Sequence, residues 1–143
     1  MEQSDKEFSE YMSTHLTGTA IEALDITIVE MAKDRIVATM PIGPNHRQPG
    51  GYLHGGISVT LAETVASLGS MLHIDRKRQA AFGLEINANH VRPKRDGLVT
   101  ATATPVHLGR NTHIWDIRIV DEQDKLICIS RCTVAVVDRP TED

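Results

Sequence analysis

One stretch near the middle of the chain has the apolar spacing of an α-helix. Apolar side chains recur there three and four residues apart, as they do along one helix face; they are Ile57, Leu61, Val65, Leu68 and Leu72. We therefore predict a helix from Ile57 to Leu72. A weaker helical spacing over residues 4–15 predicts a second helix close to the N-terminus.

Apolar and polar residues alternate through most of the remaining chain, which is the pattern of β-strands. Residues 20–30 and 35–42 form two predicted strands before the central helix, joined by a turn at 32–34. Short polar turns separate four longer predicted strands after it, at residues 80–93, 97–108, 112–121 and 126–137. This order predicts an α+β fold in which one antiparallel sheet wraps around one long central helix.

The 143 residues contain no internal repeat, low-complexity tract or linker, so we predict one domain over 1–143, with residues 1–19 as a helical extension. There is no run of about 18 apolar residues that would span a membrane. The polar start, Met1 to Asp5, lacks the features of a secretory signal. Cys128 and Cys132 lie four residues apart on one predicted strand, roughly 13 Å, which is too far for a disulfide bond. Two free thiols indicate a cytoplasmic protein.

The chain is acidic overall but carries local basic clusters. Its formal net charge is −4 and aromatic residues make up 3%, which disfavours a nucleic-acid partner. One basic cluster contains Arg92, Lys94 and Arg95, and the other spans residues 76–78. A basic patch on an acidic protein suits a small anionic ligand.

Glu63 is the only charged residue of the predicted helix. The helix side away from the apolar stripe carries mostly small residues, which are Val59, Ala62, Ala66, Ser67 and Ser70. We therefore expect the helix to be covered all round, by its own sheet or by a second subunit. Desolvation would make the Glu63 carboxylate a stronger base, and Ser67, one turn later, could hold a water beside it. The alternatives are a Glu63 that escapes to solvent at the helix edge, or one that pairs with a distant arginine.

The predicted helix begins after His54-Gly55-Gly56. Glycines let a ligand approach the backbone, and the free N–H groups of a first helical turn can polarise a carbonyl oxygen. The glycines could equally serve only to make a tight turn. Gly55 and Glu63 are eight residues apart, which is about 12 Å along a helix. If both act on one carbon atom, they come from different chains, which predicts a dimer with composite sites.

Two motifs resemble those of the hotdog-fold thioesterases of the 4-hydroxybenzoyl-CoA and phenylacetate-pathway type. The first is Gln48-Pro49 and His54-Gly55-Gly56, followed by Leu61-Ala62-Glu63-Thr64. The second, residues 83–92 with residues 107–110, resembles the branch that hydrolyses dihydroxynaphthoyl-CoA, to which the enterobactin-pathway proofreading thioesterases are closely related. The resemblance covers about residues 20–137 and departs from that branch at Pro93-Lys94.

The resemblance implies a hotdog fold that hydrolyses an acyl-CoA, with an aromatic or hydroxyaromatic acyl group and no cofactor, as a dimer or a dimer of dimers. By the same resemblance Glu63 is the nucleophile or general base, and Gln48 and the Gly55 amide bind the thioester carbonyl. His54 shapes that end of the site, and Ser67 helps to place the lytic water. The implied CoA contacts are Gly83, His90, Val91, Arg92, His107, Leu108, Gly109 and Arg110.

Other functions stay open at this point. A hotdog dehydratase would use a catalytic histidine opposite the carboxylate, and His54 lies on the wrong side of Gly55 for that role. An acyl-CoA-binding module without catalysis would have no need of a desolvated Glu63. The seven histidines show no metal-binding spacing, and the chain has neither a Gly-x-Ser-x-Gly elbow nor a phosphate-binding loop. We therefore expect no metal.

Overall fold

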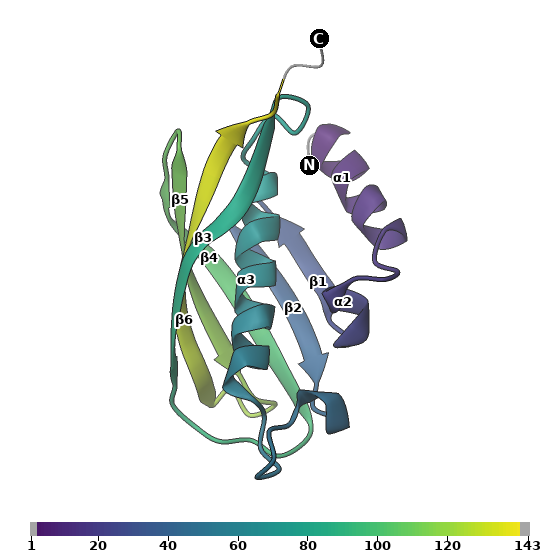
Figure 1. Ribbon diagram of the computed structural model, residues 1–143, viewed down its shortest axis with the longest axis vertical. Helices are drawn as coiled ribbons and strands as arrows, with labels where there is room; N and C mark the ends of the chain where they lie inside the picture. The colour runs from purple at the N-terminus through teal and green to yellow at the C-terminus, as the bar shows by residue number, and fades with distance from the viewer. Residues whose placement is uncertain (1–2, 141–143) are drawn as a thin grey trace.

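The computed structural model describes residues 3–140 (Figure 1). Residues 1–2 and 141–143, which belong to the predicted domain and include the start of the polar N-terminus, lie outside the described part. The elements follow one another as α1 (Gln3–Thr14), α2 (Ala20–Ala23), β1 (Thr27–Ala32), β2 (Arg35–Pro41), η1 (Pro44–His46), α3 (Gly55–Met71), β3 (Gln79–His90), β4 (Leu98–Leu108), β5 (Thr112–Val120) and β6 (Leu126–Asp138).

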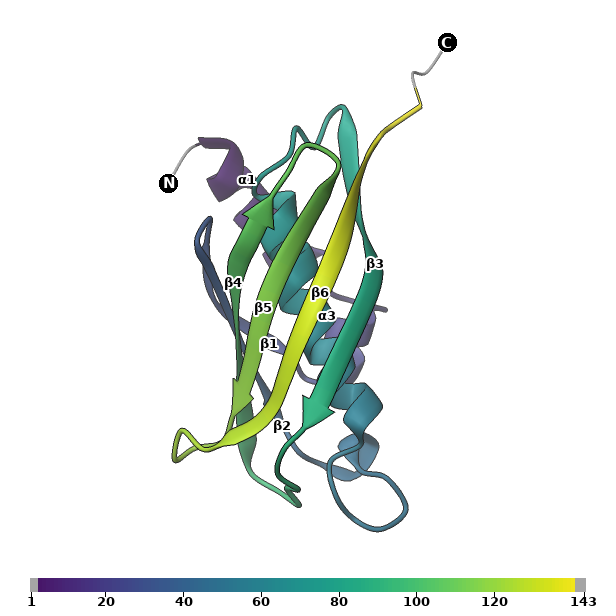
Figure 2. The same cartoon turned by 90° about the vertical axis from the view of Figure 1, so that its left-hand side faces the viewer.

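Six antiparallel strands form one sheet in the order β1-β2-β4-β5-β6-β3. Figure 1 shows α3 lying along one face of this sheet. Figure 2 shows the opposite face of the sheet, with β4, β5, β6 and β3 side by side. The predicted α+β fold, with one sheet wrapped around one long helix, is confirmed. None of the helices between residues 3 and 140 has both the length and the apolar character needed to cross a membrane.

The core lies between α3 and the sheet. The apolar stripe of α3 is buried as predicted, with Leu61 and Val65 fully enclosed by side chains such as Ile36, Met40 and Ile117. Cys128 and Cys132 are buried and free. Burial raises the pKa of Cys132 to about 12, with the Glu63 and Glu85 carboxylates acting in the same direction, so its thiol stays protonated at neutral pH.

One sequence-based expectation is wrong in detail, and the structure decides between two alternatives that the sequence left open. The predicted strand at 20–30 begins with a helical turn, because Thr19 caps α2 by accepting a hydrogen bond from the Glu22 N–H. The small residues Ala62, Ala66 and Ser70 of α3 are fully buried within their own chain, so they do not form a face toward a second subunit. The helix side that the sheet leaves partly open instead carries Thr60, Glu63, Thr64 and Ser67.

A buried polar group joins the C-terminal part of α3 to β5. The Trp115 indole N–H donates to the Ser70 hydroxyl at 2.8 Å, and His113 Nδ1 lies 3.0 Å from the same oxygen. Burial lowers the pKa of His113 below its ordinary value, and the neighbouring His73 ring, with its centroid 6.1 Å away, lowers it further. A hydrogen bond to the Gly109 backbone acts in the opposite direction. His113 is therefore built into the fold as a neutral imidazole.

This arrangement predicts that acid destabilises the fold near pH 6. Because the folded-state pKa of His113 lies below the unfolded value of about 6.5, the unfolded chain binds more protons. The free energy of unfolding should therefore fall as pH drops from about 7 through 6, and level off below the folded-state pKa. Urea titrations followed by the fluorescence of Trp115, the only tryptophan, measure this slope.

His113→Gln should flatten the slope, whereas the control His15→Gln, at an exposed position after α1, should keep it. An equal slope in wild type and His113→Gln would contradict the assignment.

Candidate active site

Glu63 opens into a cavity of about 410 Å³ on the side of α3 that the sheet leaves uncovered. Thr60, Thr64 and Ser67 line it from the helix. The remaining wall is largely apolar, formed by Ile21, Leu68, Ala81 and Phe82. A carboxylate on one wall and apolar side chains on the others can hold an uncharged group beside a base or nucleophile.

The Glu63 carboxylate lies directly against the backbone of β3. A Cβ atom added at Gly83 would overlap Glu63 Oε1, so the glycine leaves room for the carboxylate in this position. β3 carries a bulge between Gly83 and Glu85, as strands often do beside functional sites. Within residues 3–140 the carboxylate has neither an ion pair nor a hydrogen bond, so the distant-arginine alternative is not seen there.

The hydroxyl groups around Glu63 differ in their availability. Thr60 donates to the Gly56 carbonyl at 3.0 Å, and Thr64 donates to the Thr60 carbonyl at 2.7 Å, so both protons are engaged by the helix. Ser67 makes no hydrogen bond to another described residue. Of these three hydroxyls, Ser67 is the one free to hold a water one turn from Glu63.

The start of α3 presents a free backbone amide. His54 is the N-cap residue, and its Nδ1 accepts the Gly56 N–H at 2.9 Å. The Gly55 N–H is then left without an acceptor in the described chain. A Cβ atom at Gly55 would lie 2.6 Å from His90 Nε2, so the missing side chain leaves room for the His90 ring beside the start of α3. This capping role of His54 was not anticipated from the sequence.

Hydrogen bonds of His46 and Gln48 anchor the loop before α3. The buried His46 ring accepts the Gly43 N–H at 3.0 Å and lies 2.7 Å from the Leu24 carbonyl. Within this loop the Gln48 side-chain oxygen accepts the Gly50 N–H. Since its oxygen is engaged, Gln48 offers its amide NH₂ as the group left for a ligand.

Two of the cations expected to meet an anionic ligand have structural roles instead. Lys94 is paired with Glu122 at 2.9 Å. Arg95 donates to the Tyr52 hydroxyl at 3.0 Å and lies 4.2 Å from the centre of its ring. Both residues thus tie the loop after β3 to neighbouring elements. Arg92 and Arg110 are exposed, and neither makes an ion pair with another described residue.

The residues expected to contact CoA do not form one group in a single chain. His90 pairs with Cys128 near one end of β6, and Val91 and Arg92 follow it there. Thr112, which follows the turn carrying Gly109 and Arg110, pairs with Ala135 seven residues further along β6. At about 3.3 Å per residue, these two groups are about 23 Å apart.

His107 and Leu108 lie with Gly109 at the end of the sheet away from His90, and His107 packs against Gly109. Gly83 belongs to neither group, because it lies beside Glu63 in the wall of the Glu63 cavity. The structure therefore brings Glu63, Ser67 and Gly83 together, and separately Gly55, His54 and His90.

Comparison with known proteins identifies the family. The thioesterase superfamily profile matches residues 50–128. The putative esterase ComA2 of Bacillus subtilis is 55% identical over 121 residues, covering 85% of this chain and 96% of its own. A 1,4-dihydroxy-2-naphthoyl-CoA hydrolase of Listeria monocytogenes is 50% identical over 115 residues, covering 80% and 93%.

Among solved structures, the thioesterase HI1161 of Haemophilus influenzae superposes with a TM-score of 0.84 at 46% identity, covering 90% of each chain. The profile match includes the start of α3, Glu63 and Gly83, which are the residues around which the site is built. The chain therefore belongs to the thioesterase superfamily, and is a thioester hydrolase with the hotdog fold that its sequence predicts.

Proposed function

We propose that the protein hydrolyses acyl-CoA thioesters with an aromatic or hydroxyaromatic acyl group. The observation that carries the proposal is the unpaired Glu63 carboxylate at the wall of a largely apolar cavity. Phe82 and Leu68 provide a surface on which a flat ring can pack. The Listeria monocytogenes relative, named for hydrolysis of a naphthoyl-CoA, supports an acyl group of this class.

In the proposed reaction the Gly55 N–H and the Gln48 amide hold the thioester oxygen. As a base, Glu63 removes a proton from a water held near Ser67, and the water oxygen attacks the carbonyl carbon. As a nucleophile, Glu63 attacks the carbon itself, and water then cleaves the anhydride. In both routes the C–S bond breaks, the sulfur leaves as the CoA thiolate and takes up a proton, and the acid is released. The chemistry needs no cofactor, because water and these groups supply every step.

The proposed site requires two chains. Gly55 and Glu63 lie on the same helix, eight residues and about 12 Å apart, so one α3 cannot bring both to one carbon. A second chain has an obvious place to bind, because β3 is an edge strand with Phe82 61% and Leu84 66% exposed. A two-fold axis beside β3 and α3 would set the start of each α3 beside the middle of the other.

The same two-chain arrangement bears on CoA. The phosphates of CoA would contact Arg92, which lies at one end of the sheet of one chain. They would also contact Arg110, from the other end of a sheet, where assembly of the chains brings that arginine close. The 23 Å between these groups makes such a contact impossible within one chain. We therefore propose a homodimer, or a dimer of dimers, with shared substrate sites. Free buried thiols fit a reducing cytoplasm as its location.

The alternatives receive less support. A dehydratase would need a free histidine opposite Glu63, but His54 uses its Nδ1 to cap α3. A binding module without catalysis gives no reason for Gly83, whose missing side chain makes room for the Glu63 carboxylate alone.

Replacing Glu63 by Gln keeps its shape and removes the base or nucleophile. We expect kcat to fall at least about 100-fold in a thiol-release assay across benzoyl-, dihydroxynaphthoyl- and straight-chain acyl-CoAs. The fold should persist, because Glu63 makes no ion pair in the described chain. Glu30→Gln, on the edge strand β1, is the matched control and should keep wild-type activity. Near-normal turnover in Glu63→Gln would refute the mechanism.

Arg92→Ala tests the CoA contact. A remote phosphate is bound equally in the ground and transition states, so KM should rise about threefold to tenfold while kcat changes little. The KM of the wild type should also rise with salt, because exposed charge contacts are screened. Arg118→Ala, on the exposed face of β5, should leave KM unchanged. If KM changes neither in Arg92→Ala nor with salt, the CoA site lies elsewhere.

Mixed dimers test the shared site. A Gln48→Ala chain and a Glu63→Gln chain, purified together through two different tags, should regain about half of the wild-type activity per dimer, because one site is intact. A dimer of wild type with the Gln48→Ala, Glu63→Gln double variant should fall far below half, since each site then has one damaged side. If the first dimer stays inactive and the second keeps half, the site lies within one chain.

A further inference from the structure

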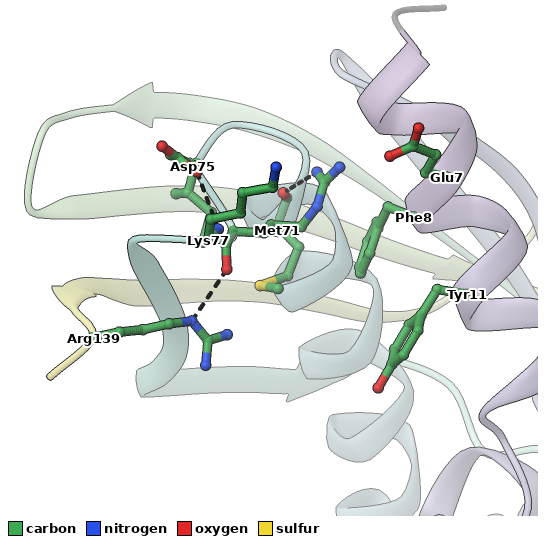
Figure 3. A pocket seen from close by; sticks show the side chains of 9 residues that line it. Glu7, Phe8, Tyr11, Met71, Asp75, Lys77 and Arg139 are labelled. Carbon is green, nitrogen blue, oxygen red and sulfur yellow. Dashed lines mark hydrogen bonds between the residues drawn. The ribbon is translucent and has the colours of Figure 1, made fainter. Parts of the chain in front are cut away.

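A second cavity, of about 770 Å³, lies between α1 and the C-terminal end of α3. Figure 3 shows Phe8 and Tyr11 of α1 on one side of it, and Lys77 and Arg139 on the other, with Met71 of α3 between them. One wall is thus aromatic and the opposite wall is basic. The reaction proposed at Glu63 uses none of these residues.

The second cavity continues the direction of the Glu63 cavity. Ser67 and Leu68 line the first cavity, and Met71, four and three residues later, lines the second, so the two are bordered by neighbouring side chains of one helix face. On the strand side, residues 81–83 line the first cavity. Arg139, which lines the second, donates to the carbonyl of Gln79 at 2.9 Å. From Glu63 to Met71 the helix rises about 12 Å.

Two cations of the second cavity are not engaged by carboxylates. Lys77 makes no side-chain ion pair or hydrogen bond with another described residue. Arg139 uses its Nε to donate to the carbonyls of Arg76 and Gln79, which leaves its terminal nitrogens for a ligand. Arg76 itself is committed to the fold, because it pairs with the buried Asp5 at 3.8 Å and lies 4.6 Å over the Phe8 ring.

Both acidic residues that line this cavity have interaction partners within the chain. Glu7 accepts a hydrogen bond from the Gln3 amide at 3.2 Å. Asp75 accepts the Lys77 backbone N–H at 3.0 Å and lies 3.9 Å from Arg78, and in Figure 3 its carboxylate points away from Met71. Glu7 keeps its negative charge, because its partner is a neutral amide, and Lys77 and Arg139 then leave a formal sum of one positive charge at this cavity.

We propose that the second cavity is the distal part of the acyl site, and that Lys77 and Arg139 bind a carboxylate at the far end of an extended acyl chain. The inference rests on the proposed hydrolysis at Glu63 and adds a substrate class to it. A compact aromatic acyl group fills the Glu63 cavity alone. A long acyl chain passes along Ser67 and Met71, packs on Phe8 and Tyr11, and ends between the two cations.

The test compares two thioesters that differ only at the distal end, hexadecanedioyl-CoA and hexadecanoyl-CoA, because a chain of this length can extend beyond the roughly 12 Å from Glu63 to Met71. We expect wild-type kcat/KM to be about fivefold higher for hexadecanedioyl-CoA, the scale of a partly exposed ion pair. Lys77→Met keeps the apolar stem and should reduce this preference through KM, and adding Arg139→Gln should abolish it. Arg78→Met is the matched control, because Arg78 is 87% exposed and does not line the cavity. It should keep the preference.

Binding to the Glu63→Gln protein, measured by calorimetry, separates this inference from the proposed function. If wild type cleaves neither thioester, hydrolysis fails as the function, but tighter binding of hexadecanedioyl-CoA that depends on Lys77 would still support the distal site. Equal binding of the two thioesters by Glu63→Gln, or a preference that survives in the Lys77→Met, Arg139→Gln double variant, overturns the inference.

Discussion

Close packing between α3 and the sheet is the constraint on which the rest of the structure depends. Gly69 shows how tight it is, because a Cβ atom there would lie 2.5 Å from the Trp115 ring. Next to it, Ser70 satisfies the Trp115 N–H, so the large indole is buried without a lost hydrogen bond. The helix is therefore fixed in position and rotation against β5. With one side of α3 committed to the sheet, the side with Glu63 is turned toward the open groove.

The candidate site lies on the side of α3 that does not pack against the sheet. β3 is the edge strand beside the open side of α3, and its Gly83 lets the Glu63 carboxylate lie against the backbone. The carboxylate packs against the Gly83 backbone, and no described cation or hydrogen-bond donor pairs with it. Further along the same helix face, Met71 lines the cavity beside α1, which the proposed distal acyl site uses.

A single chain holds the parts of the proposed reaction away from one another. The amide of Gly55 points out from the start of α3, while Glu63 lies two turns further along. Arg92 and Arg110 lie near opposite ends of the sheet. These separations follow from a straight helix and an extended sheet, and no side-chain rotation can close them. Under the proposed mechanism, a second chain bound at the exposed apolar edge of β3 would bring the two halves of the site together.

The sequence by itself determined the fold class and the order of the long helix and the strands, and it singled out Glu63 as the only charged residue of α3, because periodicity and helix composition are local patterns. It did not determine which side of α3 is covered: Ala62, Ala66 and Ser70 look like a contact face by size, yet they are buried against their own sheet. Nor did it show that Lys94 and Arg95 are paired within the chain, or that α1 closes a cavity with Lys77 and Arg139. These outcomes depend on contacts between residues far apart in the chain. Residue spacing fixes the faces of one element, but only tertiary packing decides which face meets which partner.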